Sequence, residues 1–202
     1  MTWNWQNADW PNFRYDAPSL TLLERKFLQS AGEVIGAVRH FNEDDSNQLR
    51  IELLSDEAVK TSEIEGEFLD RVSVQSSLRR QFGLNADDRQ VRPQERGIAE
   101  MMADVYRSWH SPLGHEGLFH WHSMLMAGNR YIETIGAYRE HEDAMQIVSG
   151  RLDKPAIHFE APPSRQVHAE MENFIAWFNQ SGPNGRTPLQ ALTRAAVGHL
   201  YF

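Results

Sequence analysis

The chain lacks several features that would assign it to a familiar class of protein. None of its 202 residues is cysteine, so it has no disulfide framework, and a zinc site could use only histidine and carboxylate ligands. It has no run of about 18 apolar residues, so we expect no transmembrane helix. Residues 1–6 show neither a basic segment nor an apolar run, so we expect no secretory signal and a cytoplasmic location.

Positive charge is also scarce. The chain carries 20 basic and 28 acidic residues, a formal net charge of −8. Nonspecific binding to nucleic acid requires a basic surface, so we expect no nucleic-acid partner. A helix-turn-helix regulator is the least favoured class, because no basic recognition helix is present.

Helical periodicity dominates the rest of the chain. Apolar residues recur at three- and four-residue steps, which predicts helices over about 19–41, 49–64, 71–82, 93–109, 117–127, 164–178 and 188–202. Ser19 is the expected N-cap of the first helix, the polar residues 42–46 form a break, and Thr187-Pro188 opens the last helix. We therefore predict an all-α fold, divided into an N-terminal part over 1–90 and a second part over 91–202.

One stretch departs from this periodicity. Between about 135 and 159 the apolar residues alternate, with Met145 and Ile147 on one side of Ser149-Gly150 and Ala156 and Phe159 on the other. Alternation around a small polar pair predicts a β-hairpin. The predicted fold class is therefore all-α with one β-hairpin.

The first 17 residues are rich in aromatic side chains and have no helical pattern. We interpret this segment as a strap packed across a helical body, since burying an aromatic side chain stabilises a fold by roughly 1.5–3 kcal/mol. The alternative is an exposed docking peptide. The aromatic residues are Trp3, Trp5, Trp10, Phe13 and Tyr15.

The hexapeptide Thr61-Ser62-Glu63-Ile64-Glu65-Gly66 is the most informative motif. It resembles the inhibitory motif of Fic-domain proteins, which has Ser or Thr, three further residues, Glu, and then Gly or Asn. Spacing alone favours an ordinary helix with a solvated acidic face, and it is the resemblance of the surrounding residues that favours the inhibitory motif. The position of the motif before the core is similar to the Fic class whose inhibitory helix is N-terminal.

The resemblance extends over most of the chain. Residues 3–13 resemble the N-terminal domain that precedes some bacterial Fic domains. Gly136-Ala137-Tyr138-Arg139, together with residues 145–150, resembles the hairpin flap of the family, and Ala161-Pro162-Pro163 resembles the segment after that flap. Residues 189–202 resemble the helix that delivers the catalytic loop, and the predicted fold is accordingly a Fic-like helical core with a flap.

The resemblance implies a function and a set of site residues. Fic proteins transfer AMP from ATP to a protein hydroxyl, and their inhibitory Glu pairs with an Arg that would otherwise hold the γ-phosphate; Glu65 would take that role here. A carboxylate competes with phosphate for the same guanidinium donors. Thr61 would brace the site, and Gly66, lacking a Cβ, would let the helix approach its neighbour.

The same resemblance assigns a target site to the hairpin. A free strand edge can add an extended segment of a target protein, and the candidate target-binding residues are Met145, Gln146, Ile147 and Val148. The alternative is a structural hairpin that covers the core.

The catalytic loop of the family has no counterpart in these residues. Its His-Pro-Phe signature is missing, and His199 lacks the residues that should come after it, so no catalytic residue is assigned. ATP and Mg²⁺ are implied by the family, but the loop that would bind them is not in this sequence. We therefore expect the N-terminal portion of an auto-inhibited protein adenylyltransferase; whether this chain alone is an enzyme stays open.

Metal ligands and protein partners give two further expectations. His115, His120 and His122 lie close together in the sequence. On a helix, however, His120 and His122 point to nearly opposite sides and cannot chelate one ion, so we expect no metal site. The competing function is a noncatalytic helical module that binds or regulates other proteins. The aromatic strap or the region of Trp109 would supply a homodimer interface if the protein forms one.

Overall fold

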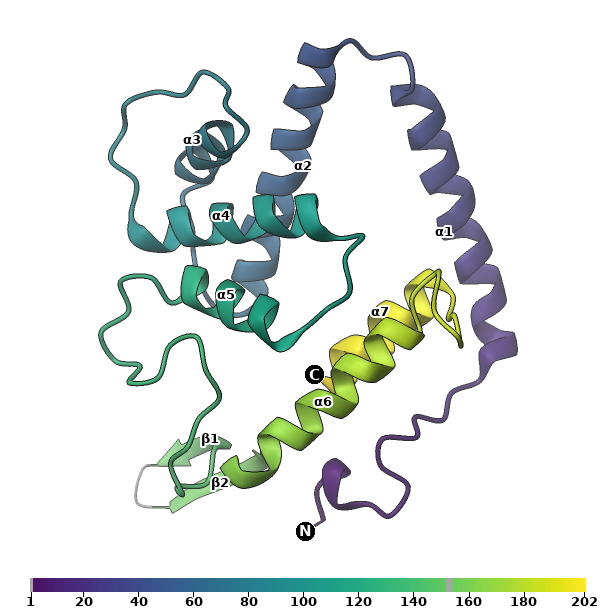
Figure 1. Ribbon diagram of the computed structural model, residues 1–202, viewed down its shortest axis with the longest axis vertical. Helices are drawn as coiled ribbons and strands as arrows, with labels where there is room; N and C mark the ends of the chain where they lie inside the picture. The colour runs from purple at the N-terminus through teal and green to yellow at the C-terminus, as the bar shows by residue number, and fades with distance from the viewer. Residues whose placement is uncertain (1, 152–153) are drawn as a thin grey trace. The chain divides into compact units, whose positions relative to one another are not determined.

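The computed structural model describes residues 2–151 and 154–202 and is mostly helical (Figure 1). Within these ranges the chain forms one short 3-10 helix, seven α-helices and one two-stranded antiparallel hairpin, which confirms the predicted fold class. The elements are η1 (Asn4–Gln6), α1 (Ala17–Val38), α2 (Glu43–Ile64), α3 (Arg71–Gln81), α4 (Pro93–Ser108), α5 (His115–Leu125), β1 (Gln146–Arg151), β2 (Lys154–Glu160), α6 (Ser164–Gln180) and α7 (Ala191–Tyr201).

The chain divides into two compact units. One joins Met1–Ala31 to Tyr138–Phe202 and is called here the terminal unit; the other, Gly32–Ala137, is called the central unit. The division falls within α1. The predicted boundary near residue 90 stays a prediction. Among the described residues, no helix is both long and apolar enough to cross a membrane.

The central unit is built from α2 to α5 around small and aliphatic side chains. α3 packs against α2 and α4, and α5 packs against α4. Close packing is strictest at Gly97 of α4, where an added Cβ would lie 2.0 Å from the carbonyl oxygen of Met124. The buried apolar residues are Ile51, Ala58, Val74, Leu78, Ile98, Ala99 and Ala103.

The start of α2 corrects one expectation. The predicted polar break over 42–46 is wrong, because α2 begins at Glu43. The side chain of Asn42 accepts a hydrogen bond from the backbone N–H of Asp45, 2.8 Å away, and so caps the helix. Acidic residues in the first turn also favour the positive end of the helix dipole, so the polar run begins the helix instead of interrupting it.

A buried carboxylate organises the start of α4. Glu95 is 1% exposed and accepts hydrogen bonds from the backbone N–H groups of Arg92 (3.0 Å) and Asp70 (3.2 Å) and from Nε of Arg92 (2.8 Å). Burial alone would raise the pKa of Glu95, but the hydrogen bonds from Arg92 and Asp70 outweigh it and hold the pKa below its ordinary value. Glu95 thereby fixes the starts of both α3 and α4.

The aromatic strap packs within the terminal unit, as predicted. The Trp10 ring meets the Tyr201 ring at 5.3 Å between centroids, and its Nε1 donates to Glu170 of α6 at 3.0 Å. Trp5 Nε1 donates to the carbonyl oxygen of Glu160 at 2.7 Å, beside the hairpin. The side chain of Tyr201, 7% exposed, also contacts Phe13, Phe174 and Trp177, so the strap completes an aromatic core.

Helix α7 starts later than its sequence indicates. It begins at Ala191 and not at Pro188, because Glu24 of α1 accepts hydrogen bonds from the backbone N–H groups of Leu192 (3.2 Å) and Thr193 (2.7 Å). The first helix also differs: α1 begins at Ala17, so Ser19 lies inside its first turn and its hydroxyl donates to the carbonyl oxygen of Asp16. The N-cap prediction for Ser19 is therefore wrong.

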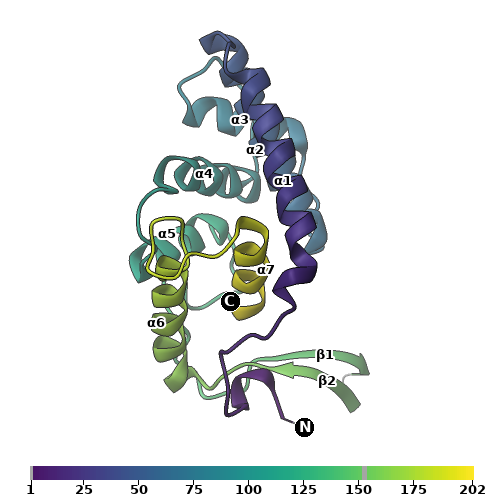
Figure 2. The same cartoon turned by 90° about the vertical axis from the view of Figure 1, so that its right-hand side faces the viewer.

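The hairpin is present, but its turn is not where alternation placed it. β1 and β2 run side by side and antiparallel (Figure 2), and Ser149 and Gly150 pair with Ala156 and Pro155 inside the ladder. The connection between the strands therefore lies farther along the chain, outside the described residues. An irregularity in the register separates Ile147 from Val148.

Candidate functional site

The motif of residues 61–66 forms the C-terminal end of α2. Glu65 is the C-cap, and Gly66 follows with a φ of +82°. The backbone N–H of Gly66 donates to the carbonyl oxygen of Glu63 (3.1 Å), and that of Glu67 to that of Ser62 (2.8 Å). This pair of hydrogen bonds is a Schellman motif, in which glycine supplies the left-handed residue.

This geometry gives Gly66 a role in helix capping. Apart from its two chain neighbours, no atom of the described residues lies within 4 Å of where its Cβ would be, so the expected close approach to a neighbouring helix stays a prediction. Helix capping by itself accounts for a glycine at this position. It does not explain Glu65, since any residue can occupy a C-cap with ordinary backbone angles.

Four polar side chains of α2 in or near the motif pair with one another within the helix. Thr61 donates its hydroxyl hydrogen to Glu57 at 3.1 Å, and Lys60 forms an ion pair with Glu63 at 2.9 Å. The hydrogen bond to Glu63, with its negative charge, raises the pKa of Lys60. The Thr61 hydroxyl therefore braces Glu57, and Thr61 meets Glu65 only through the backbone, where its carbonyl oxygen accepts from the Glu65 N–H at 3.4 Å.

Glu65 stands apart from this network. Its side chain is exposed, and within the described residues its carboxylate forms neither a hydrogen bond nor an ion pair. It lies at the negative end of the α2 dipole, together with Glu63 and Glu67, where negative charge is disfavoured. The end of α2 is thus an acidic surface that would attract a guanidinium or ammonium group.

The candidate target-binding residues lie on the hairpin of the terminal unit. Gln146, Ile147 and Val148 belong to β1, every residue of which is exposed, and Met145 immediately precedes the strand. Met145 accepts a backbone hydrogen bond from Ala161 at 2.9 Å, and Gln146 donates to Glu160 at 2.7 Å. Because the described sheet has only two strands, each strand has a second edge without a strand partner.

The base of the hairpin holds the side chain of Arg139, which the sequence marked only as part of the resemblance over residues 136–139. Arg139 donates to the carbonyl oxygen of Pro162, and so ties the segment before β1 to the segment after β2. Burial lowers the pKa of the Arg139 guanidinium. Its Nε is buried without a partner among the described residues. A lone arginine in a polar segment gives no signal of this burial.

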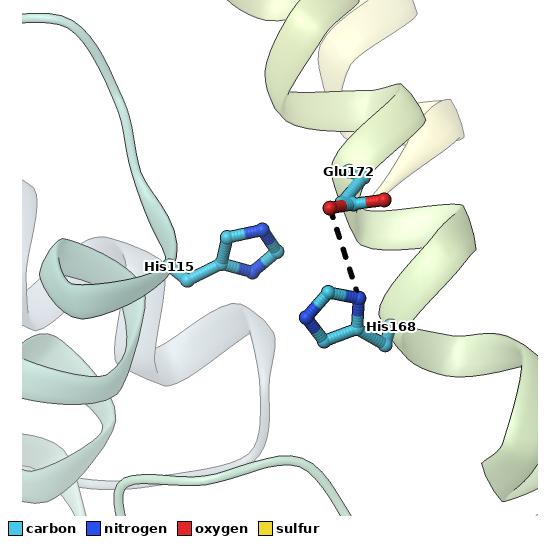
Figure 3. Close-up of side chains that lie close together, drawn as sticks. All are labelled: His115, His168 and Glu172. Carbon is cyan, nitrogen blue, oxygen red and sulfur yellow. Dashed lines mark ion pairs between the residues drawn. The ribbon is translucent and has the colours of Figure 1, made fainter.

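Histidine side chains that could bind a metal lie on α5 and α6. On α6, Nδ1 of His168 lies 4.0 Å from a carboxylate oxygen of Glu172, one turn away (Figure 3). His115, drawn in the same figure, belongs to α5 of the central unit. His122, also on α5, accepts a hydrogen bond at Nδ1 from the backbone N–H of Gly136 at 3.1 Å, which gives it a structural role.

Two comparisons with known proteins bear on the site. Residues 3–84 match a family model described as "Domain of unknown function (DUF4172)". The match covers less than half of the chain, and it includes the aromatic strap, the first three α-helices and the motif at residues 61–66. No curated protein matches the chain.

Proposed function

We propose that this chain is the N-terminal portion of an auto-inhibited, Fic-type protein adenylyltransferase, in which Glu65 is the inhibitory residue. Residues outside this sequence would transfer AMP from ATP to a hydroxyl of a target protein. Glu65 would bind the arginine that otherwise holds the γ-phosphate. One observation carries the proposal: an exposed carboxylate, without a partner among the described residues, stands at the helix end where its charge is least favourable.

The residues around the motif suit a cation and not a nucleotide. Lys60 is the nearest basic side chain along α2, and it is already paired with Glu63. The triphosphate of ATP therefore does not fit this end of α2, and we assign no ligand of ATP or of Mg²⁺ to the described residues. This supports a blocking role for Glu65, because an acidic surface repels a triphosphate and holds a guanidinium.

The hairpin supports the second half of the proposal. Its exposed strands offer main-chain donors and acceptors to an extended segment, and Met145, Ile147 and Val148 are at least half exposed. Strand addition would hold a target through its backbone and demand little of its sequence. A target protein bound in this way would present its hydroxyl beside the hairpin.

The test compares Glu65 with a neighbouring glutamate in the full natural polypeptide that contains these residues. Incorporation of AMP from radiolabelled ATP is measured for the wild type, Glu65→Gly and Glu67→Gly. Glu67 is a matched control, because it is exposed, acidic, outside the helix and two residues away. A charge-assisted pair contributes about 1.5–3 kcal/mol, so Glu65→Gly should raise incorporation roughly tenfold to a hundredfold.

The two variants and the wild type separate the possible explanations. Equal incorporation by the wild type and Glu65→Gly would remove the inhibitory role of Glu65. An equal rise in both variants would assign the effect to general acidity and not to one carboxylate. No incorporation by any form would contradict the transferase proposal itself, and an intact mass of the purified protein would show whether the chain extends beyond these residues.

The second candidate, a noncatalytic helical module that binds other proteins, is favoured by one observation. Helix α1 exposes large apolar side chains, including Leu22, Leu28 and Ile35, each at least half exposed. Exposed apolar surface of this kind marks interaction sites. Unchanged binding of a captured partner by a protein that lacks all transfer activity would support this candidate over the enzyme.

A further inference from the structure

The central unit contains a groove that neither the motif nor the hairpin involves. Its volume is about 380 Å³, and most of its wall is aliphatic, formed by Val38, Leu49, Leu53 and Leu54. Tyr106 and Arg50 also line it, and Ser46 adds a hydroxyl. Small-molecule sites have this size and this composition, an apolar wall with a few polar groups that fix orientation.

Arg50 is held in a defined position beside the groove. Its guanidinium lies over the Tyr106 ring at 5.0 Å from the centroid and over the Phe82 ring at 5.2 Å. Nη1 donates to the side-chain oxygen of Asn47 at 2.9 Å. Stacking and one hydrogen bond leave further N–H groups of the planar fork available to a ligand.

The guanidinium of Arg50 forms no ion pair within the part of the chain that the structure describes. Within residues 2–151 and 154–202, the ion pairs of the structure place no carboxylate within 4.0 Å of its guanidinium, although Arg71 on α3 pairs with both Glu52 and Asp56. A half-buried cation stacked on two rings and lining an apolar groove is complementary to an anion with an apolar body. The three acidic residues in the first turn of α2 favour a monoanion over a dianion.

We propose that this groove binds a small amphiphilic carboxylate. The alkyl or aryl body would lie against Leu49, Leu53 and Leu54, and the carboxylate would accept hydrogen bonds from Arg50. This site lies in the central unit and does not depend on the proposed transferase function. Its occupancy can therefore be measured in the 202-residue chain, independently of any AMP transfer.

The experiment compares two probes that share an eight-carbon body and differ in head group, a charged carboxylate in one and a neutral hydroxyl in the other. Binding of octanoate and of octanol to the 202-residue chain is measured by isothermal titration calorimetry. Octanoate should bind about tenfold more tightly, since a hydrogen-bonded charge pair contributes at least that factor. Arg50→Gln should lower the affinity for octanoate about tenfold and leave that for octanol unchanged.

Two further variants keep the result decisive. Arg79→Gln is the matched control, because Arg79 belongs to the same unit, bonds to Gln48 and does not line the groove. It should bind both probes like the wild type. Leu53→Glu places a carboxylate three residues from Arg50 on the same helix, so it should abolish the preference for octanoate. The side chain of Leu53 is 57% exposed, so this substitution should leave the fold intact.

The outcomes separate the groove from other apolar surfaces. Octanoate that binds equally well to the wild type and to Arg50→Gln would be held elsewhere, for example on the exposed face of α1, and would overturn the proposal. Equal affinities of the wild type for octanoate and octanol would overturn it too, as would no binding of octanoate at all. If Arg50→Gln unfolds, as circular dichroism would reveal, Leu53→Glu gives the same discrimination.

Discussion

Each of the two units contains a glutamate buried at a helix start, but the two carboxylates work over different distances along the chain. Glu95 in the central unit accepts backbone hydrogen bonds from Arg92 and Asp70, 3 and 25 residues away. Glu24 in the terminal unit accepts them from Leu192 and Thr193, 168 and 169 residues away. One carboxylate organises a local turn of chain, whereas the other joins the two ends of the sequence.

The cores of the two units also differ in the kind of side chain that fills them. The central unit packs aliphatic and small side chains so closely that α4 meets the backbone of α5 at Gly97. The terminal unit packs aromatic rings around Tyr201 and ties its strap down with hydrogen bonds from Trp5 and Trp10. The central unit should therefore be sensitive to added volume, and the terminal unit to lost hydrogen bonds.

Added volume at Gly97 should have the largest effect on stability. In Gly97→Ala, the new Cβ would lie 2.0 Å from the carbonyl oxygen of Met124, so backbone must move, and we expect a loss of about 3 kcal/mol in the free energy of unfolding. Gly117→Ala on α5 is the control, because its Cβ would meet no described atom within 4 Å. It should stabilise the protein by about 0.5–1 kcal/mol. Urea unfolding measures both, and an unchanged midpoint for Gly97→Ala would contradict the close contact.

Removing the two buried carboxylates should have smaller and spatially separate effects. Glu95→Ala leaves two backbone N–H groups and Arg92 without their acceptor, and we expect a loss of about 2 kcal/mol. Amide hydrogen exchange should rise in α3 and α4. Glu24→Ala should instead raise exchange at the start of α7. Exchange that rises in both units in either variant would contradict their description as two separately packed bodies.

The sequence separation between each buried glutamate and the helix start that it caps explains which helix boundaries the sequence could predict. The start of α4 was predicted correctly, because Pro93 and the acceptor Glu95 lie within one turn of each other. The start of α7 was predicted three residues too early, since its cap is a glutamate of α1 that no local pattern connects to it. Likewise, alternation revealed the hairpin but not its turn, because Ser149 and Gly150 also fit within a strand ladder.

The candidate sites show the same contrast between features set by neighbours in the sequence and features set by distant residues. Apolar periodicity placed the motif at the end of a helix over about 49–64, and the structure adds that Gly66 caps α2 while the Glu65 carboxylate has no partner among the described residues. The groove at Arg50 had no sequence signal. Its parts come from the end of α1, from α2 and from Tyr106 of α4, and only packing brings them together.

The smallest expected effect is the loss of folding stability at low pH, to which Glu24 and Glu95 both contribute. Hydrogen bonds hold the pKa of both Glu24 and Glu95 below the ordinary value of 4.5, although burial opposes this shift in each case. A carboxylate with a lowered folded-state pKa stabilises the fold fully above that ordinary value, and the contribution is lost as the pH falls through the lower, folded value. Unfolding in urea from about pH 7 to about pH 3 should therefore show stability falling below the ordinary pKa. Glu24→Gln and Glu95→Gln should each flatten this fall, because an amide cannot take up the proton. A curve for either variant that runs parallel to that of the wild type would mean that its carboxylate is not held ionised by these bonds.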